Sequence, residues 1–268
     1  SGRHKDFTLD LALDAGKGYL VASRLIPVAR LEGFETVGQL VAHLRTRPPG
    51  PLHARAVEAI ATTETSFFRD HHPFEALRQH VIPELVRTRR RTSQLLTIWS
   101  AACSSGQEPY TLAMILREVI PDLGSWTLQL MASDFSAAMV EKARQGVYQQ
   151  LEVNRGLPAK MLVRYFDQRD GGWHVKDELK KMITFFQHNL NHDWMSIPQA
   201  DLILLRNVLI YFDLDTRREI LKRVRRHLKV DGYLVLGAAE TTLNVDDGFS
   251  RVQFGRAFFY QRKDVGAS

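Results

Sequence analysis

Polar residues follow several apolar runs of this chain, at the points where buried strands would end. The run 97–101 leads through small residues to Gly106 and Glu108, and Pro109 suits the first turn of a helix that begins there. This arrangement places backbone N–H groups and a carboxylate around one cavity at the carboxyl edge of a strand. In open α/β sheets, that edge is where nucleotide-like ligands bind.

The composition of this turn indicates which ligand it suits. Gly106 is its only glycine, so the three-glycine fingerprint of dinucleotide binding is absent and a pyrophosphate is a poor match. Asp134, at the end of the run 127–133, can accept hydrogen bonds from both hydroxyls of a ribose. The structural alternative for Asp134 is a cap on the helix that follows it. A ligand with a ribose and a zwitterionic tail, such as S-adenosylmethionine, is therefore predicted.

Two further strand ends carry polar side chains. Asn189 and Leu190 follow the run 183–187, and Arg206 and Asn207 follow the run 201–205. Parallel strands end at the same edge of a sheet, so these residues are expected near Glu108 and Asp134. An Asn side chain offers a donor and an acceptor, which suits the edge of an adenine, although Asn is also common in turns.

Arg69 and Tyr211 are the candidates for contact with a second substrate. Arg69 follows two phenylalanines, and its planar guanidinium could hold a carboxylate through two hydrogen bonds. Tyr211 lies shortly after the fourth strand, from which its hydroxyl could reach the same cleft. The structural alternatives are a surface arginine packed on Phe68 and a half-buried tyrosine bonded to the backbone.

The elements that position these residues alternate along most of the chain. Strands are predicted at 95–101, 127–133, 183–187, 201–205, 233–237 and 256–261, and helices at 74–86, 108–119, 136–146 and 215–228. Apolar strands alternating with helices predict an α/β fold with a parallel sheet covered on both faces. The last strand has no crossover helix before it and is expected to be antiparallel. Residues 158–182 predict an inserted hairpin around the turn Asp170-Gly171-Gly172.

The N-terminal part has a different pattern. Residues 7–62 are predicted to be helical, with Thr36 as the N-cap of one helix and a further helix at 53–62. The proline-rich stretch 47–51 separates these helices as a short stiff linker. Residues 1–62 are therefore predicted to form a helical domain of their own.

Composition limits the class of protein. The chain has 268 residues, 44% of them hydrophobic and 25% charged, as in ordinary soluble globular proteins. Cys103 is the single cysteine, which favours a reducing cytoplasm, and no activating base is evident beside it. His188 and His192 lack a ligand set, so no metal is expected. The net charge of +6 includes arginine-rich stretches at 87–91 and 217–226, either solvated faces or a surface for an acidic partner.

Three linked motifs match a known family. Residues 65–70 (TSFFRD), 99–110 (WSAACSSGQEPY) and 205–213 (LRNVLIYFD) resemble, in order and spacing, the CheR-type chemoreceptor glutamate O-methyltransferases. The likeness runs over nearly the whole chain. It implies a class I S-adenosylmethionine-dependent methyltransferase (Rossmann-like) sheet in residues 63–268, with a small β-subdomain inserted at about 163–182, and a helical domain in residues 1–62 that docks on the receptor.

The resemblance also implies an activity. The chain would transfer a methyl group from S-adenosylmethionine to glutamates on the cytoplasmic helical bundle of methyl-accepting chemoreceptors, giving glutamate methyl esters and S-adenosylhomocysteine. The residues implied around the cofactor are Thr63, Thr65, Arg69, Gly106, Glu108, Asp134, Asn189, Leu190, Arg206 and Asn207. Arg69 and Tyr211 would also face the acceptor as catalytic residues. The protein is expected to be a cytoplasmic monomer that needs no metal, binds no nucleic acid and does not insert into membranes.

The sequence departs from the family in three places. Thr63 stands where the family usually has Asn, and residues 237–240 read GAAE where Gly-His-Ser-Glu is common. The segment 167–174 is short, so a tether to a receptor's C-terminal peptide is not expected. Two alternatives stay open: a non-catalytic S-adenosylmethionine-binding signalling module, and a nucleic-acid methyltransferase. The second lacks the Pro-Pro-aromatic motif of amino-methylating enzymes after the fourth strand.

Overall fold

The chain divides into two units. The computed structural model describes residues 18–48, 50–60 and 64–263. One unit comprises Ser1–Thr63 with Tyr211–Asp213, and the other comprises Glu64–Ile210 with Leu214–Ser268. In the described part of the chain, no helix is both long and apolar enough to cross a membrane.

The first unit is built from helices α1 (Gly18–Leu31), α2 (Val37–Thr46) and α3 (Pro51–Ile60). Thr36 caps α2 as predicted: its hydroxyl accepts the Gln39 N–H at 3.2 Å, and the Gln39 side chain accepts the Thr36 N–H at 3.3 Å. This reciprocal box satisfies amide groups that a helix start leaves unpaired. The helices share a small buried core of Leu25, Ala29, Leu40, Leu44 and Ala56. The predicted helical stretch 7–17 lies outside the described residues.

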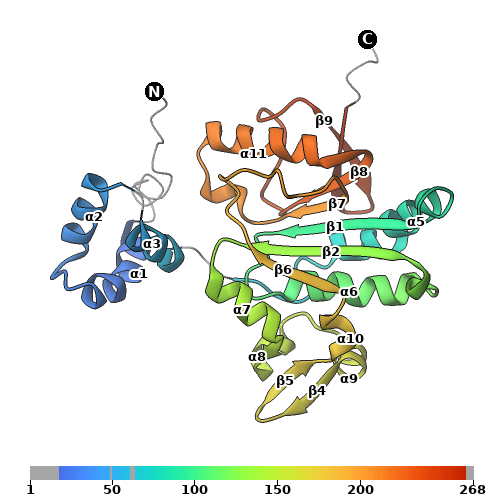
Figure 1. The fold of residues 1–268 in the computed structure, drawn as a ribbon, viewed down its shortest axis with the longest axis horizontal. Helices are drawn as coiled ribbons and strands as arrows, with labels where there is room; N and C mark the ends of the chain where they lie inside the picture. Colours follow the sequence, from blue (N-terminus) through green and yellow to red (C-terminus); the bar gives the residue numbers. More distant parts are fainter. Residues whose placement is uncertain (1–17, 49, 61–63, 264–268) are drawn as a thin grey trace. The chain divides into compact units, whose positions relative to one another are not determined.

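A seven-stranded sheet forms the centre of the second unit, in the order β6-β2-β1-β7-β8-β10-β9 (Figure 1). The strands are β1 (Leu95–Ala101), β2 (Thr127–Asp134), β6 (Ile183–Gln187), β7 (Ala200–Leu205), β8 (Leu228–Leu236), β9 (Phe249–Phe254) and β10 (Ala257–Arg262). Neighbours from β6 to β8 are parallel, whereas β10 is antiparallel to β8 and β9. The predicted α/β sheet with an antiparallel last strand is confirmed, and the edge strand β9 was not predicted.

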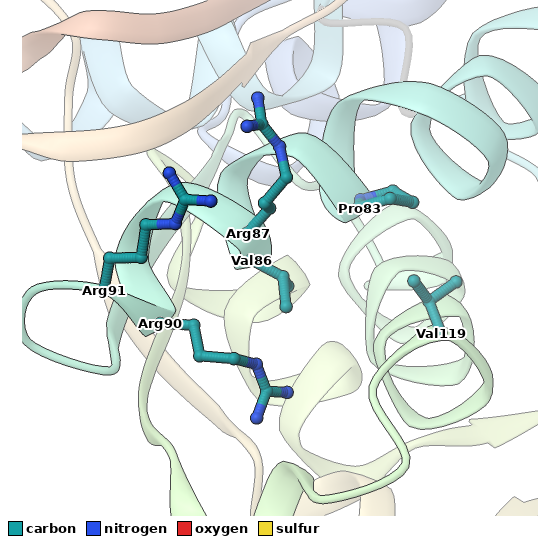
Figure 2. Close-up of a pocket in the computed structure, with 6 residues that line it drawn as sticks. All are labelled: Pro83, Val86, Arg87, Arg90, Arg91 and Val119. Carbon is teal, nitrogen blue, oxygen red and sulfur yellow. The ribbon is translucent and has the colours of Figure 1, made fainter.

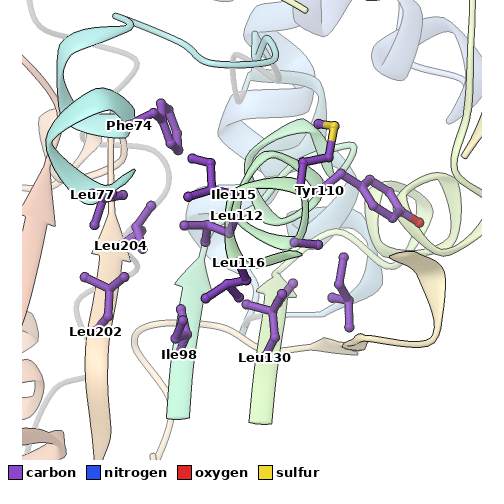
Figure 3. Close-up of a cluster of buried hydrophobic side chains, with 14 of the residues drawn as sticks. Phe74, Leu77, Ile98, Tyr110, Leu112, Ile115, Leu116, Leu130, Leu202 and Leu204 are labelled. Carbon is purple, nitrogen blue, oxygen red and sulfur yellow. The ribbon is translucent and has the colours of Figure 1, made fainter. Parts of the chain in front are cut away.

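Helix α6 (Gln107–Val119) supplies much of the core that holds the central strands together. Figure 3 shows its Leu112, Ile115 and Leu116 beside strand residues that include Ile98 and Leu130. All of these side chains are buried, and each such burial stabilises the fold by roughly 1.5–3 kcal/mol. The packing fixes the first turn of α6 at the carboxyl edge of the sheet.

The other helices of this unit mostly agree with the prediction. They are α4 (His72–Ala76), the π-helical turn Leu77–Val81, α5 (Ile82–Arg90), α7 (Ala137–Gln145) and α11 (Leu214–His227). The predicted single helix 74–86 is in fact interrupted by the π-helical turn. Ser136 caps α7 as predicted, accepting the Met139 N–H at 3.3 Å.

A small sheet with the order β3-β5-β4 lies beside the large one (Figure 1). Strands β4 (Phe166–Arg169) and β5 (Gly172–Val175) form the predicted antiparallel hairpin, and β3 (Val147–Tyr148) adds a strand that was not predicted. Short helices α8 (Gln150–Asn154), α9 (Ala159–Tyr165) and α10 (Asp177–Lys180) connect it to the rest. Through Tyr148 this sheet contacts the turn that follows β1.

Candidate functional site

The turn between β1 and α6 has a backbone conformation that few residues adopt. Ala102 and Ser104 have φ values of 57° and 49°, in the left-handed region, and Gly106 has a φ of 96°. A Cβ atom on Gly106 would lie 2.8 Å from the Cβ of Ala143, so only glycine fits there. Non-glycine residues in this region cost free energy and gather at binding sites. The turn leads into the N-terminus of α6, whose unpaired N–H groups favour acceptors.

A buried ion pair lies beside this turn. The Glu108 carboxylate accepts the Ser100 hydroxyl at 2.8 Å and Nη1 of Arg206 at 3.1 Å. Nη2 of Arg206 donates to the Asp70 carboxylate at 2.7 Å and to the Arg69 carbonyl at 2.9 Å. The Arg206 side chain is only 2% exposed, so water screens this pair weakly. Arg206 thus joins the end of β7, the start of α6 and the loop 65–70.

Three buried atoms at this edge have no hydrogen-bond partner among the described residues: Nε of Arg206, Oδ1 of Asn207 and Nε2 of His188, the residue after β6. Asn207 is also left-handed, with a φ of 59°. Buried polar atoms without partners are uncommon in native proteins, because each costs about 1–3 kcal/mol. One donor and one acceptor at adjacent positions are therefore available to a ligand.

Asp134 closes the other side of the turn. Its carboxylate accepts the Ser104 N–H at 2.8 Å and the Ser136 N–H at 3.0 Å. The cap of α7 is the Ser136 side chain, so the alternative of Asp134 as that helix's N-cap does not describe this structure. Instead, Asp134 holds the β1–α6 turn against the end of β2.

The end of β6 joins the same edge. The His188 N–H donates to the Asp134 carbonyl at 2.9 Å, which places Asn189 directly beyond it in the chain. The Asn189 carboxamide oxygen accepts the Asn191 N–H at 3.0 Å, and Leu190 is buried. Burial lowers the pKa of the His188 imidazole, and the nearby His192, Arg223 and His227 lower it further.

The loop 65–70 presents Thr65 and Arg69. Arg206 anchors this loop through the Arg69 carbonyl, while Nη1 of Arg69 donates to the Glu64 carbonyl at 2.8 Å. Tyr211 groups with the first unit, so its relation to Arg69 stays a prediction. Thr63 lies outside the described residues.

Cys103 and the histidines offer no competing chemistry in the described residues. Burial, with smaller contributions from the Asp134 and Glu108 carboxylates, raises the pKa of the Cys103 thiol well above its usual range. A thiol that resists deprotonation is a poor nucleophile. No group of three or more His, Cys, Asp or Glu in this part of the chain could hold a metal ion.

An open cavity of about 470 Å³ lies elsewhere, along α5 and beside the last residue of α6 (Figure 2). Its lining residues are Pro83, Val86, Arg87, Arg90, Arg91 and Val119. Arg90 is already paired with Asp122, at 2.7 and 2.8 Å, and lies over the Trp126 ring. Because Val119 lies 11 residues after Glu108 in α6, the cavity is roughly 17 Å along the helix from the Glu108 edge. Its lining carries the positive charge of three arginines but no acidic residue that could act as a general acid or base with them.

The sequence reasoning missed three residues that shape the site. Asp70 pairs with Arg206, Ser100 donates to Glu108, and Glu240 accepts backbone N–H groups from the loop after β7. Asp70 lies within the quoted motif 65–70, and Glu240 ends the motif 237–240. Both acidic residues lie next to turns, and this position was the feature of the sequence that could have identified them.

Comparison with known proteins gives consistent results. Residues 63–258 match the family described as CheR methyltransferase, SAM binding domain. The chain is 40% identical over 260 residues to Chemotaxis protein methyltransferase 1 of Pseudomonas aeruginosa. This alignment covers 96% of this chain and 94% of that protein. It is 39% identical to Chemotaxis protein methyltransferase Cher2 of Pseudomonas putida, covering 94% and 93%. It is 36% identical to Chemotaxis protein methyltransferase 1 of Vibrio cholerae, in an alignment that covers 94% of this chain and 92% of that protein.

Proposed function

Because the chain belongs to the CheR methyltransferase family, we propose that it methylates glutamate side chains of chemoreceptors. The methyl donor is S-adenosylmethionine, and the products are glutamate methyl esters and S-adenosylhomocysteine. The named relatives, each a chemotaxis protein methyltransferase, support this assignment. The acceptor is the cytoplasmic helical bundle of the receptor, so the chain would act in the cytoplasm, as a monomer and without a metal.

One observation carries the proposal. The buried Glu108–Arg206 pair lies next to the Gly106 turn and leaves Nε of Arg206 and Oδ1 of Asn207 without partners. A zwitterionic nucleoside such as S-adenosylmethionine offers carboxylate, amino, hydroxyl and adenine groups that suit such a set. Asp134 is suited to accept the ribose hydroxyls, as acidic residues do in related folds. Thr63, Thr65, Asn189 and Leu190 complete the proposed cofactor site.

The chemistry asks little of the protein beyond alignment. When bound, S-adenosylmethionine supplies a sulfonium-linked methyl group that a carboxylate oxygen can attack. A glutamate carboxylate is already ionised near neutral pH, so the chain need not supply a general base. The charges cancel as the bond forms, so orientation and exclusion of water contribute most to the rate.

Arg69 and Tyr211 are proposed to orient the acceptor carboxylate. One nitrogen of the Arg69 guanidinium is held by the Glu64 carbonyl, which fixes the side chain while other donors of the group can bind a carboxylate. Too tight an ion pair would reduce the nucleophilicity of the carboxylate, so one orienting contact from each residue suffices. The Tyr211 hydroxyl would supply the second.

Transfer to receptor fragments tests the proposal. The protein is incubated with tritium-labelled S-adenosylmethionine and receptor cytoplasmic fragments, and the product is treated with mild alkali. Labelled methanol released by alkali is expected, because a carboxyl methyl ester hydrolyses and an N-methyl group does not. A fragment with its glutamates changed to alanine serves as control. Tight cofactor binding without transfer to any fragment would instead favour the non-catalytic signalling module.

The N-terminal unit is proposed to bind the acidic receptor bundle, because residues 1–63 carry 8 Lys and Arg against 6 Asp and Glu, a net charge of +2. If charge drives this docking, raising the salt from 50 to about 500 mM should weaken receptor binding several-fold, because screening shortens the range of the attraction. Affinity of the labelled receptor fragment, measured by fluorescence anisotropy, checks this. An affinity independent of salt would argue against electrostatic docking and leave the catalytic proposal standing.

A further inference from the structure

Glu240 lies in the turn that follows β8 and gathers four backbone N–H groups. Its Oε2 accepts the N–H of Asn207 and that of Gly237, both at 2.7 Å. Its Oε1 accepts the N–H of Leu209 at 2.7 Å and that of Ile210 at 3.3 Å. The carboxylate therefore fastens the loop after β7 to the turn after β8, two neighbouring strand ends at the carboxyl edge of the sheet.

Charge and packing both single out this contact. Among the described residues, no Lys, Arg or His forms an ion pair with Glu240. The partners of its carboxylate are the four backbone N–H groups, in hydrogen bonds stronger than neutral ones. A Cβ atom on Gly237 would lie 2.6 Å from Nδ2 of Asn207 and 2.7 Å from Oε2 of Glu240. The three residues are thus packed without room for one methyl group.

Asn207 needs such support. It holds a left-handed φ of 59°, which costs free energy for a residue with a side chain, and its buried Oδ1 has no partner in the described part of the chain. Without the acceptor on its N–H, the loop could relax to an ordinary conformation and turn the carboxamide away.

We infer that Glu240 is a positioning residue of the cofactor site, acting through the backbone of Asn207. The inference rests on the proposed function, since it takes Asn207 to contact S-adenosylmethionine. Glu240 need not touch the cofactor itself. Its contribution is to set the loop 206–210 before the cofactor arrives, so that binding does not have to order it.

The isosteric change Glu240→Gln isolates this contribution. Each carboxylate oxygen accepts two N–H groups, so either orientation of the glutamine amide turns an NH₂ donor against two other donors. Burying unsatisfied donors in this way should weaken S-adenosylmethionine binding about tenfold or more, measured by calorimetry. The amide proton resonances of Asn207 and Leu209 should move upfield as their charge-assisted bonds are lost.

Asp246→Asn is the matched control. Asp246 also accepts a backbone N–H, that of Gly248 at 2.8 Å, in the segment between β8 and β9. Among the described residues its carboxylate otherwise pairs with Arg225, at 3.6 Å, and with no residue of the proposed site. Its variant should keep the cofactor affinity of the wild type, even if its melting temperature falls. Equal affinity in Glu240→Gln and Asp246→Asn would overturn the inference, as would a Glu240→Gln variant that loses stability but no affinity.

A measurement on the wild type keeps the inference testable if Glu240→Gln does not fold. Added S-adenosylmethionine should shift the amide resonances of Asn207 and Gly237 and leave that of Gly248 in place. Binding that leaves the Asn207 and Gly237 amides unchanged would overturn the role of Glu240 alone. A wild type that binds no S-adenosylmethionine would instead refute the proposed function.

Discussion

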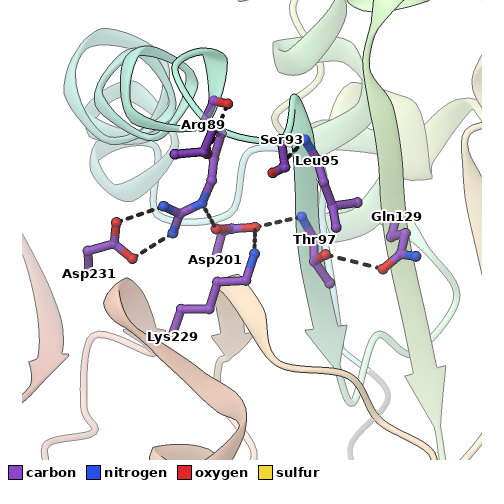
Figure 4. Close-up of polar contacts among 9 residues, drawn as sticks. Arg89, Ser93, Leu95, Thr97, Gln129, Asp201, Lys229 and Asp231 are labelled. Atoms are coloured by element: carbon purple, nitrogen blue, oxygen red, sulfur yellow. Dashed lines mark hydrogen bonds and ion pairs between the residues drawn. The ribbon is translucent and has the colours of Figure 1, made fainter.

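Two buried arginines lie at opposite edges of the large sheet, and their surroundings differ. At the amino edge, Arg89 of α5 donates Nε to Asp201 and both terminal nitrogens to Asp231 (Figure 4). Asp201 also accepts the Thr97 N–H at 2.8 Å and the Lys229 ammonium at 2.9 Å. At the carboxyl edge, Arg206 pairs with Glu108 and Asp70, but its Nε has no partner among the residues that the structure describes.

The difference separates a structural cluster, Arg89 with Asp201, Lys229 and Asp231, from a binding cluster, Arg206 with Glu108, Asp70 and Asn207. Every nitrogen of the Arg89 guanidinium has a carboxylate partner, and Asp201 is fully buried with both oxygens engaged. A buried polar network that is fully satisfied makes the fold rigid and leaves nothing for a ligand. The carboxyl edge instead retains an unpaired donor and acceptor beside left-handed residues, a cost that binding can offset. Changes at the two edges should therefore affect different properties.

The largest effect is expected at the amino edge. Asp201→Asn should lower the free energy of unfolding by about 3–5 kcal/mol, because it leaves Arg89 and Lys229 beside a buried neutral group. Urea unfolding measures the loss, and Asp122→Asn, in an exposed pair with Arg90, is a control that should change stability little. S-adenosylmethionine affinity of the remaining folded protein should stay at the wild-type value. If Asp201→Asn lowered the free energy of unfolding only slightly, the Arg89 cluster would not be what stabilises the fold.

Arg69→Ala should give the next largest effect, on activity alone. Methyl transfer, as kcat/KM for the receptor fragment, should fall about 100-fold or more, as when one orienting donor is removed from an active site. The unfolding curve should match that of the wild type, because among the described residues the Arg69 side chain bonds only the nearby Glu64 carbonyl. Arg87→Ala, an exposed arginine of the remote cavity, is the control and should keep full activity. Near-normal turnover in Arg69→Ala would refute its catalytic role.

The strands could be predicted from the sequence because a buried strand consists mostly of apolar residues. Strands β1 and β7 are almost entirely apolar, and β7 is buried at every position, so no helical stripe competes with a strand there. Strand β9 reads Phe-Ser-Arg-Val-Gln-Phe at the edge of the sheet, with partly exposed positions throughout its middle. Its pairing with β10 depends on tertiary position, which composition does not reveal.

The candidate site was predictable in its residue types but not in its connections. Glu108, Asp134 and Arg206 each follow a strand, so topology alone places them at one edge. The contacts of Arg206 with Asp70 and of Glu240 with Asn207 join residues 136 and 33 positions apart. Such pairings require the fold itself. The same holds for Arg89, whose cluster of neighbours 87–91 suggested a surface although its guanidinium turns inward.

Gly106→Ala should show how much the strained turn between β1 and α6 contributes to S-adenosylmethionine affinity. The new Cβ would meet Ala143 at 2.8 Å, so the turn must shift, and S-adenosylmethionine binding should weaken about tenfold. Gly171→Ala is matched to it, since Gly171 also has a positive φ, of 73°, but nothing lies within 4 Å of its added Cβ. Both variants should lose some stability, and only Gly106→Ala should lose affinity. Equal affinities would place the cofactor away from this turn.

The smallest expected effect is a difference in how the two edges respond to acid. Burial lowers the pKa of His188 at the carboxyl edge below its usual 6.5, so the folded protein binds this proton less readily than the unfolded chain does. The unfolded chain binds the proton more readily as the pH falls below about 6.5, and stability therefore decreases with acidification in that window. At the amino edge, Arg89 lowers the pKa of Asp231 below its usual 3.8, and the stability this gives is lost only below about pH 4.

Two variants separate these windows in urea unfolding measured from pH 7.5 to pH 3. His188→Gln should flatten the pH dependence just below about pH 6.5 and leave the fall below about pH 4 unchanged. Asp231→Asn should be less stable than the wild type at pH 7 and approach it below pH 4, where protonation removes the same pairing with Arg89. If both variants changed the same window, the two edges would be thermodynamically coupled, and a structural cluster separate from a binding cluster could not be maintained.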